Sequence, residues 1–221
     1  MMTSRAARSQ ALGLLSLTLV LAGCFGAMQS TPDNPTGAGG LTPRVEDPDA
    51  GLVAVAPGFD LKRYKIVVVE KFPVTDPGLK DEGDRRFASK MAPILQIELV
   101  RRLKDSGLFR NVVNTSESQY RPGSEPALRL EGAITRLGRG SQVVRYFAGA
   151  FGAGRTRAQA DMRLVEVPSG RVVAVTADRR IASVGFFGGT DEEHLEESFD
   201  DMARDFAKFL VRLSRGEAGT K

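Results

Sequence analysis

Residues Tyr64–Phe72 have the sequence Tyr-Lys-Ile-Val-Val-Val-Glu-Lys-Phe. The central residues are β-branched and apolar at consecutive positions, so both faces of a strand formed here would need to be buried. The stretch therefore predicts a central strand in a sheet that has apolar layers on both sides.

A helix is predicted after this strand, beyond a polar loop over residues 73–84. Apolar residues at four-residue spacing extend from Arg85 to Ser106. Pro93 lies inside this pattern, so either the helix kinks there or its regular part begins near Ala92. Gly107 stands where a left-handed residue commonly ends a helix. The apolar stripe consists of Met91, Leu95, Leu99 and Leu103.

Strand patterns dominate the middle of the chain. Apolar and polar residues alternate over 128–136 and 157–167, which is the period of a half-buried strand. The turn sequence Pro168-Ser169-Gly170 separates the second of these from the next strand, so the two should form an antiparallel hairpin. The predicted strands cover residues 108–114, 128–136, 157–167 and 171–182.

The last element is a helix that begins after a capping-box pair, Thr190 and Glu193, and ends at Gly216. The element order is thus strand, helix, four strands and helix. This order predicts one two-layer α+β domain over residues 59–216, with a mostly antiparallel sheet and both helices on one face. Residues 217–221 are predicted to be a disordered tail.

The N-terminus has the layout of a secretory signal peptide over residues 1–23. Two arginines precede the apolar run Ala11–Leu21, which is shorter than the about 20 residues of a membrane span. Leu21-Ala22-Gly23-Cys24 closes the run and resembles the bacterial lipobox, in which the cysteine is acylated and the chain is cut before it. The alternative is that Cys24, the only cysteine, is an accidental thiol in a conventional signal peptide.

Acylation of Cys24 would anchor the mature chain to a membrane, since two or three acyl chains bind stably. Phe25 follows where an aspartate would resemble the inner-membrane retention signal, so the resemblance implies the periplasmic face of the outer membrane. Residues 24–58 are rich in Gly, Pro and Asp and are predicted to be a flexible tether. Alternatively, Leu52–Val55 packs on the domain as an edge segment.

Charge and cysteine content exclude two further possibilities. The chain has 31 basic and 27 acidic residues, and loss of Arg5 and Arg8 with the signal brings these numbers close to balance. This balance argues against nucleic acid as a partner. A single cysteine cannot form an intrachain disulfide, even in an oxidising compartment.

Two segments rich in glycine and aromatic residues, 137–154 and 185–189, are the candidate contact sites. They could supply apolar anchors and positive charge to a partner or to the membrane. Alternatively, they are turns whose aromatic side chains cover the core. The first segment is not followed by a helix pattern, which argues against a phosphate-binding loop. The candidate partner- or ligand-contact residues are Arg139, Arg145, Tyr146, Phe147, Phe151, Phe186 and Phe187.

Catalytic candidates are few. His194 is the only histidine and would have to serve any catalytic triad, or bind a metal together with Glu197. Acidic residues surround it on the first turns of the last helix, where the helix dipole already explains them. We therefore predict a solvated helix start and no catalytic residue, metal or cofactor; a hydrolase of unknown type is a minor alternative.

Three sequence features resemble a group of bacterial outer-membrane lipoproteins known only as a domain of unknown function (DUF4410). They are Leu-x-x-Ser-Gly-Leu-Phe-x-x-Val at Leu103–Val112, the glycine-rich segment Gly138–Gly154, and Val-Pro-Ser-Gly-Arg-Val-Val at Val167–Val173. The resemblance covers about residues 60–185.

By shape, the predicted domain is also similar to small envelope lipoprotein domains. Examples are auxiliary subunits of ABC transport systems, the N-terminal domain of the Tol translocation protein and activators of peptidoglycan synthases. Together these resemblances imply a non-enzymatic accessory protein that docks an envelope partner or a second copy of itself. A lipid- or hydrophobic-ligand-binding module is the alternative.

Overall fold

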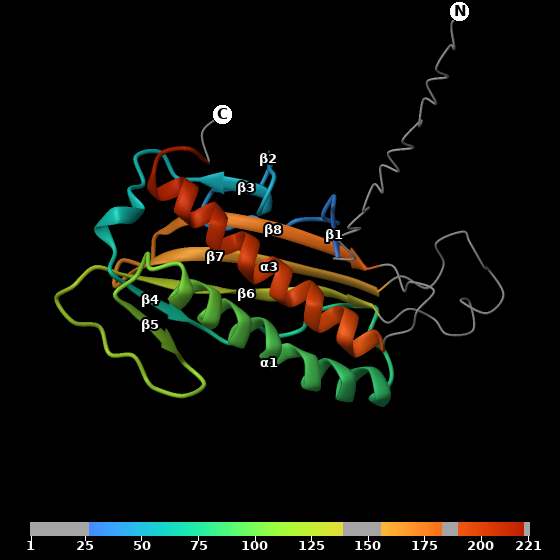
Figure 1. Cartoon of the computed structure of the whole chain (residues 1–221). Helices are drawn as coiled ribbons and strands as arrows, with labels where there is room; N and C mark the ends of the chain where they lie inside the picture. Colours follow the sequence, from blue (N-terminus) through green and yellow to red (C-terminus); the bar gives the residue numbers. More distant parts are fainter. Residues whose placement is uncertain (1–26, 139–155, 183–189, 219–221) are drawn as a thin grey trace, which may run out of the picture.

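The computed structural model describes residues 27–138, 156–182 and 190–218 (Figure 1). The helices are the short 3-10 helix η1 (Leu61–Arg63), α1 (Glu82–Asp105) and α3 (Asp191–Ser214). The strands are β1 (Met28–Ser30), β2 (Val45–Asp47), β3 (Gly51–Val55), β4 (Ile66–Val69), β5 (Asn111–Asn114), β6 (Ala127–Gly138), β7 (Thr156–Val167) and β8 (Val172–Ala182).

All eight strands join one sheet in the order β2-β3-β8-β7-β6-β4-β5, and β1 pairs with the remaining length of β8. The long helices α1 and α3 lie side by side on one face of this sheet (Figure 1). Strand β4 is parallel to β5 and to β6, and the other named pairs are antiparallel. Helix α1 carries the chain back between β4 and β5, and the loop over residues 115–126 carries it back between β5 and β6. The protein is therefore the predicted two-layer α+β domain.

Strand β4 is buried on both faces, as its consecutive apolar residues predict. Val67 and Val69 belong to the main core between the sheet and the helices. Ile66 and Val68 belong to a smaller cluster on the opposite face, together with Ala127 of β6. The largest buried side chains of the main core come from both helices and the sheet: Phe199, Phe206, Phe209, Met91, Leu95, Leu99, Leu103, Leu128, Leu130 and Ile134.

Helix α1 begins earlier than the apolar spacing predicts. The side chain of Asp81 accepts a hydrogen bond from the backbone N–H of Asp84 at 2.8 Å, so the first turn is capped by polar residues that precede the stripe. Pro93 lies inside the helix, so the alternative start near Ala92 is wrong. Gly107 follows the helix with φ of +65°, as predicted.

Both predicted ends of α3 are confirmed. Thr190 and Glu193 form the capping box, with each side chain bonded to the other's backbone N–H. At the other end Gly216 has φ of +77°, and the N–H of Glu217 bonds to the carbonyl of Arg212 at 2.9 Å. Glu217 and the buried Ala218 thus complete the helix end, so the predicted disordered tail is wrong for these two residues.

The predicted flexible tether over residues 24–58 is wrong for its described part. Strands β1 and β3 pair with successive lengths of β8, and β2 pairs with β3. The alternative that Leu52–Val55 packs on the domain is confirmed, because these residues lie in β3. Strand β3 is not the edge of the sheet, however, because β2 pairs with its outer side. The N-terminal segment is therefore part of the sheet.

Buried polar side chains of β7 explain how the N-terminal segment, which has few apolar residues, is held against the sheet. Gln159 and Asp161 lie on the sheet face opposite the helices, yet both are buried. Gln159 accepts a hydrogen bond from the N–H of Asp33 at 2.7 Å and donates one to its carbonyl at 2.9 Å. Asp161 accepts a hydrogen bond from the N–H of Thr36 at 2.8 Å. Backbone groups of the N-terminal segment thus replace water over this face.

The carboxylate of Glu166, at the end of β7, connects the segment after η1 to the turn between β7 and β8. Arg171 donates a hydrogen bond from Nε to Oε2 at 2.9 Å, and the Tyr64 and Ser169 hydroxyls also donate to the carboxylate. The hydrogen bonds from Arg171, Tyr64 and Ser169 outweigh the effect of burial and lower the pKa of Glu166 to about 2.

This depressed pKa predicts an acid-sensitive contribution to stability. The contribution of Glu166 is present above its ordinary pKa of about 4.5 and is lost as pH falls toward 2, since a protonated carboxyl loses the attraction of Arg171. We expect Glu166→Gln to cost about 1 kcal/mol or less at pH 7, because Arg171 is largely exposed. Urea unfolding from pH 7 to pH 2 should show the cost shrinking with acidity; a cost that is the same at both ends would contradict the assignment.

Candidate functional site

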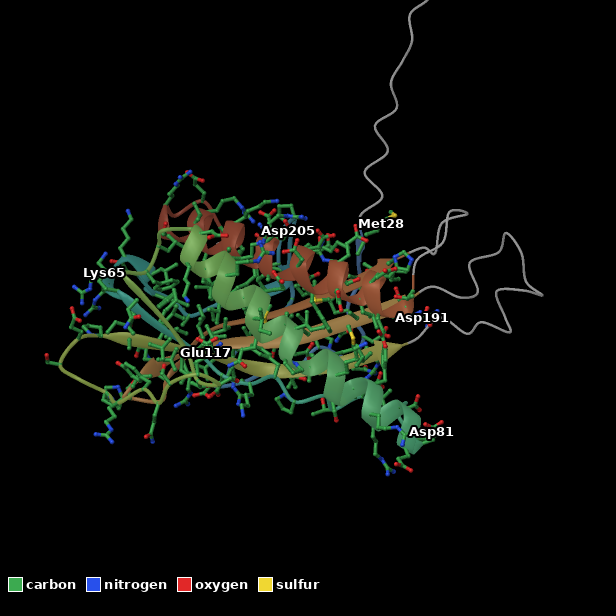
Figure 2. The ribbon with its side chains drawn as sticks, turned by 60° about the horizontal axis from the view of Figure 1, so that its bottom comes forward. Met28, Lys65, Asp81, Glu117, Asp191 and Asp205 are labelled. Carbon is green, nitrogen blue, oxygen red and sulfur yellow. The ribbon has the colours of Figure 1, made fainter. Side chains whose placement is uncertain are left out.

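At one end of the sheet lie the first described residues of the chain, which we call the chain entry, and the strand ends that flank both candidate segments. Met28 pairs with Ile181, Thr156 pairs with Ala182, and Gly138 pairs with Arg157 on the next strand. The chain therefore passes into residues 1–26, 139–155 and 183–189 from adjacent strand ends (Figure 1). Figure 2 shows Met28 and Asp191 toward this end and Lys65 at the opposite end. We call it the anchor end.

The predicted site residues themselves lie outside the described residues. This holds for the lipidation site Cys24 and for the contact residues Arg139, Arg145, Tyr146, Phe147, Phe151, Phe186 and Phe187. The structure brings together the strand ends that flank their three segments. The predicted hairpin of β7 and β8 already places both aromatic-rich segments beside strand ends on the same side of the domain. The position of the chain entry beside them could not be predicted, because it depends on the pairing of β1 with β8.

The first described residues are firmly attached to the anchor end. Ala27 is buried, and the side chain of Gln29 donates to Asp178 at 3.4 Å. Arg179 donates to the carbonyl of Thr31 at 3.1 Å and forms an ion pair with Asp33 at 2.7 Å. The domain thus begins three residues after Cys24, where the sequence predicts a tether of more than thirty residues.

A buried ionic cluster joins the sheet to α3. Arg180 of β8 lies between Asp178 at 2.8 Å and Asp205 of α3 at 3.1 Å, and all three side chains are at most one tenth exposed. Burial raises the pKa of Asp178. Burial would lower the pKa of Arg180, but the charge of Asp178 outweighs it and the pKa is raised. Asp205 also pairs with Lys208 at 2.7 Å, so each of these buried charges has a partner.

A second ionic contact fixes the turn between β2 and β3 to the same helix. Arg212 pairs with Asp47 at 2.6 Å and with Asp49 at 2.7 Å. Asp47 also accepts hydrogen bonds from the N–H groups of Asp49 and Ala50. These charged groups connect elements to one another and have the geometry of structural ion pairs. Neither cluster is evident from the sequence, because the elements that they join are far apart in the chain.

His194 lies on the first turn of α3 and is less solvated than predicted. Its side chain is partly buried, and Nε2 is shielded from solvent without a hydrogen-bond partner among the described residues. Its backbone carbonyl accepts a hydrogen bond from the Ser198 hydroxyl at 2.7 Å. Within the described ranges, no group of three His, Cys, Asp or Glu side chains could hold a metal ion.

A polar groove of about 480 Å³ lies at the loop after β5 and is lined by Ser116, Ser118, Tyr120 and Arg129, among others. The Ser116 hydroxyl donates to the buried Gln96 at 2.6 Å, and Arg129 donates to Glu131 at 2.6 Å. These polar groups serve contacts within the domain. The alternative of an apolar ligand pocket near Phe147 and Phe186 falls on residues outside the described ranges.

Several solved structures of low sequence identity are similar to this chain. A PelC dodecamer from Paraburkholderia phytofirmans is 14% identical over 70% of this chain and 98% of its own, with a TM-score of 0.43. A Xanthomonas campestris protein of the DUF330 family is 13% identical over 76% and 95%, with a TM-score of 0.42. A provisionally assigned lipoprotein of Caulobacter crescentus CB15 is 14% identical over 72% and 96%, with a TM-score of 0.34. These likenesses concern the fold alone.

Among curated proteins no sequence matches this chain at a significant level. In the part of the chain that the structure describes, no helix is long and apolar enough to cross a membrane. One family model matches residues 67–185, which form more than half of the chain and include β4 through β8. The protein therefore belongs to the family of the domain of unknown function DUF4410.

Proposed function

We propose that this protein is a lipid-anchored accessory protein of the bacterial envelope. Acyl chains on Cys24 hold it at the periplasmic face of the outer membrane, where it docks a partner of an envelope transport or assembly system. One observation supports this proposal most strongly. The chain entry lies at the same end of the sheet as the strand ends that flank both aromatic-rich segments. Anchor and contact segments would then act at the same place.

The composition of the two segments suits a docking role. Both contain aromatic residues, and the longer one also contains arginines; these residue types are enriched at protein interfaces. Anchoring to one membrane confines the protein and its partner to a thin layer, which raises the effective concentration for a weak contact. A second copy of the chain is an alternative partner under the same proposal.

A non-enzymatic role agrees with the buried charges. Arg180, Asp178 and Asp205 neutralise one another beneath α3, and Arg212 serves the turn between β2 and β3. These groups link elements of the fold, so they stabilise structure and need no reaction to explain them.

Deleting Gly149–Gly154 is expected to remove the partner from a crosslinked pulldown, because the deletion shortens the longer aromatic-rich segment. The experiment uses detergent-solubilised envelopes from cells that make the full lipidated chain. Lys65→Ala is the matched control, since Lys65 is exposed at the opposite end of the domain. The control should retain every partner. A deletion variant that captures the same set of proteins as the control would contradict the proposed docking site.

A further inference from the structure

The short distance between Cys24 and the folded domain has a consequence for how the protein sits on its membrane; this inference rests on the lipid anchor proposed above. Ala27 is already buried, and β1 begins at Met28 with ladder pairing to β8. Two residues lie between Cys24 and Ala27, and the three fully extended Cα steps that join them span about 10 Å. An acylated Cys24 therefore keeps the anchor end within about 10 Å of the lipid headgroups.

The domain is long compared with this connection. Strand β7 alone has 12 residues, which corresponds to about 40 Å along the sheet. It runs from Thr156 at the anchor end to Val167 near the turn to β8. Figure 2 places Met28 and Lys65 at opposite ends of the domain. The connection is too short to let the Lys65 end approach the membrane while the anchor end moves away.

The anchor end also presents an apolar side chain. Met28 is 73% exposed, and among the described residues only Met28 and Ile97 are large hydrophobic side chains with high exposure. Met28 is four residues from the acylation site, so the distance that limits the anchor also brings this side chain to the headgroup region. A flexible, apolar thioether can enter that region without leaving a charge unpaired.

We propose that the anchor end, with β1 and Met28 at its surface, rests directly on the lipid bilayer and that the Lys65 end points into the periplasm. The bound surface is that of a phospholipid leaflet. The orientation also places any docking through the anchor end at the level of the membrane, so the partner would be embedded in the bilayer or lie on it.

Spin labels test this orientation. Because acylation blocks the thiol of Cys24, an introduced cysteine is the only free thiol of the mature protein. The full lipidated protein carries a nitroxide at Met28→Cys or at Lys65→Cys, two exposed positions. It is reconstituted into vesicles of phosphatidylethanolamine and phosphatidylglycerol. Power saturation compares collision with lipid-soluble oxygen and with a water-soluble nickel chelate. We expect an oxygen-to-nickel ratio several-fold higher at position 28 than at position 65.

A linker variant serves as the control for the short connection. Insertion of about 12 Gly and Ser residues between Gly26 and Ala27 adds roughly 20 Å of flexible reach, and should remove most of the difference between the two labels. Equal ratios in the protein without the insertion, or a higher ratio at position 65, would overturn the orientation. Mass spectrometry of the same samples separates the two failures: a protein without acyl chains refutes the proposed anchor, whereas an acylated protein with equal ratios refutes only the orientation.

Discussion

A chain that begins at residue 59, and thus retains only the predicted domain, is expected to be unfolded or to aggregate at 25 °C. The deletion removes β1, β2 and β3, so the whole edge of β8 loses its partners. It also leaves the buried side chains of Gln159 and Asp161 without the backbone groups that bond them. Water replaces these backbone groups in the shorter chain, so each lost hydrogen bond costs about 0.5–1.5 kcal/mol. The lost ladder and the lost burial of Ala50 and Val53 add to this. The total approaches the 5–15 kcal/mol that stabilises a typical domain.

The comparison uses two purified chains, residues 27–218 and residues 59–218, unfolded in urea and followed by circular dichroism. The shorter chain should show no cooperative transition. Two point variants sharpen the test: Gln159→Ala should cost about 2–3 kcal/mol, whereas Asp33→Ala should cost less than about 1 kcal/mol, because Asp33 bonds Gln159 through its backbone. Equal urea midpoints for the two chains would show that residues 27–58 are a dispensable tether.

Replacing Arg180 with methionine is expected to destabilise the domain by about 3–5 kcal/mol, because Asp178 would remain buried without a cation, whereas Asp205 would keep Lys208 as a partner. Arg110→Met is the matched control: Arg110 pairs with Glu125 at the surface, and its loss should cost no more than about 1 kcal/mol. Urea unfolding at pH 7 measures both. Similar small costs for the two variants would contradict the proposed role of the buried cluster.

The pH dependence of the Arg180 variant has a definite sign. Burial already raises the pKa of Asp178, and loss of the arginine charge should raise it further. A carboxyl group whose pKa is raised in the folded state lowers the stability of the fold least when the pH is below its unfolded pKa. The loss of stability grows as the pH rises through the folded pKa. Arg180→Met should therefore recover part of its lost stability between pH 7 and pH 4. A cost that grows over this interval would rule out the buried carboxylate as its cause.

The parts of the fold that follow from local patterns are predictable from the sequence. Four consecutive apolar residues mark β4 as a strand buried on both faces, and a capping pair and a left-handed glycine mark the two ends of α3. Each signal lies within a few residues of the structure it specifies. The element order then predicts both the two layers and the helices on one face.

The N-terminal segment is not predictable in this way. Its glycines, prolines and aspartates suggest a flexible chain, yet its order comes from side chains more than one hundred residues away, Gln159 and Asp161. These polar residues alternate with apolar ones in β7, which suggests a solvated face. The position of the N-terminal entry at the anchor end is hidden for the same reason, because it depends on the long-range pairing of β1 with β8. The predicted hairpin of β7 and β8 does bring the two aromatic-rich segments to one side of the domain. What the sequence does indicate is which residue types these segments carry.

The mass of the mature protein tests whether acyl chains on Cys24 attach the folded domain directly to a membrane. The protein is extracted from envelopes with detergent, and its N-terminal peptide is measured by mass spectrometry beside a Cys24→Ser control. We predict a peptide that starts at residue 24 and carries a diacylglycerol group with an acylated amine. An unmodified Cys24, or a peptide that retains residues 1–23, would refute the lipid anchor.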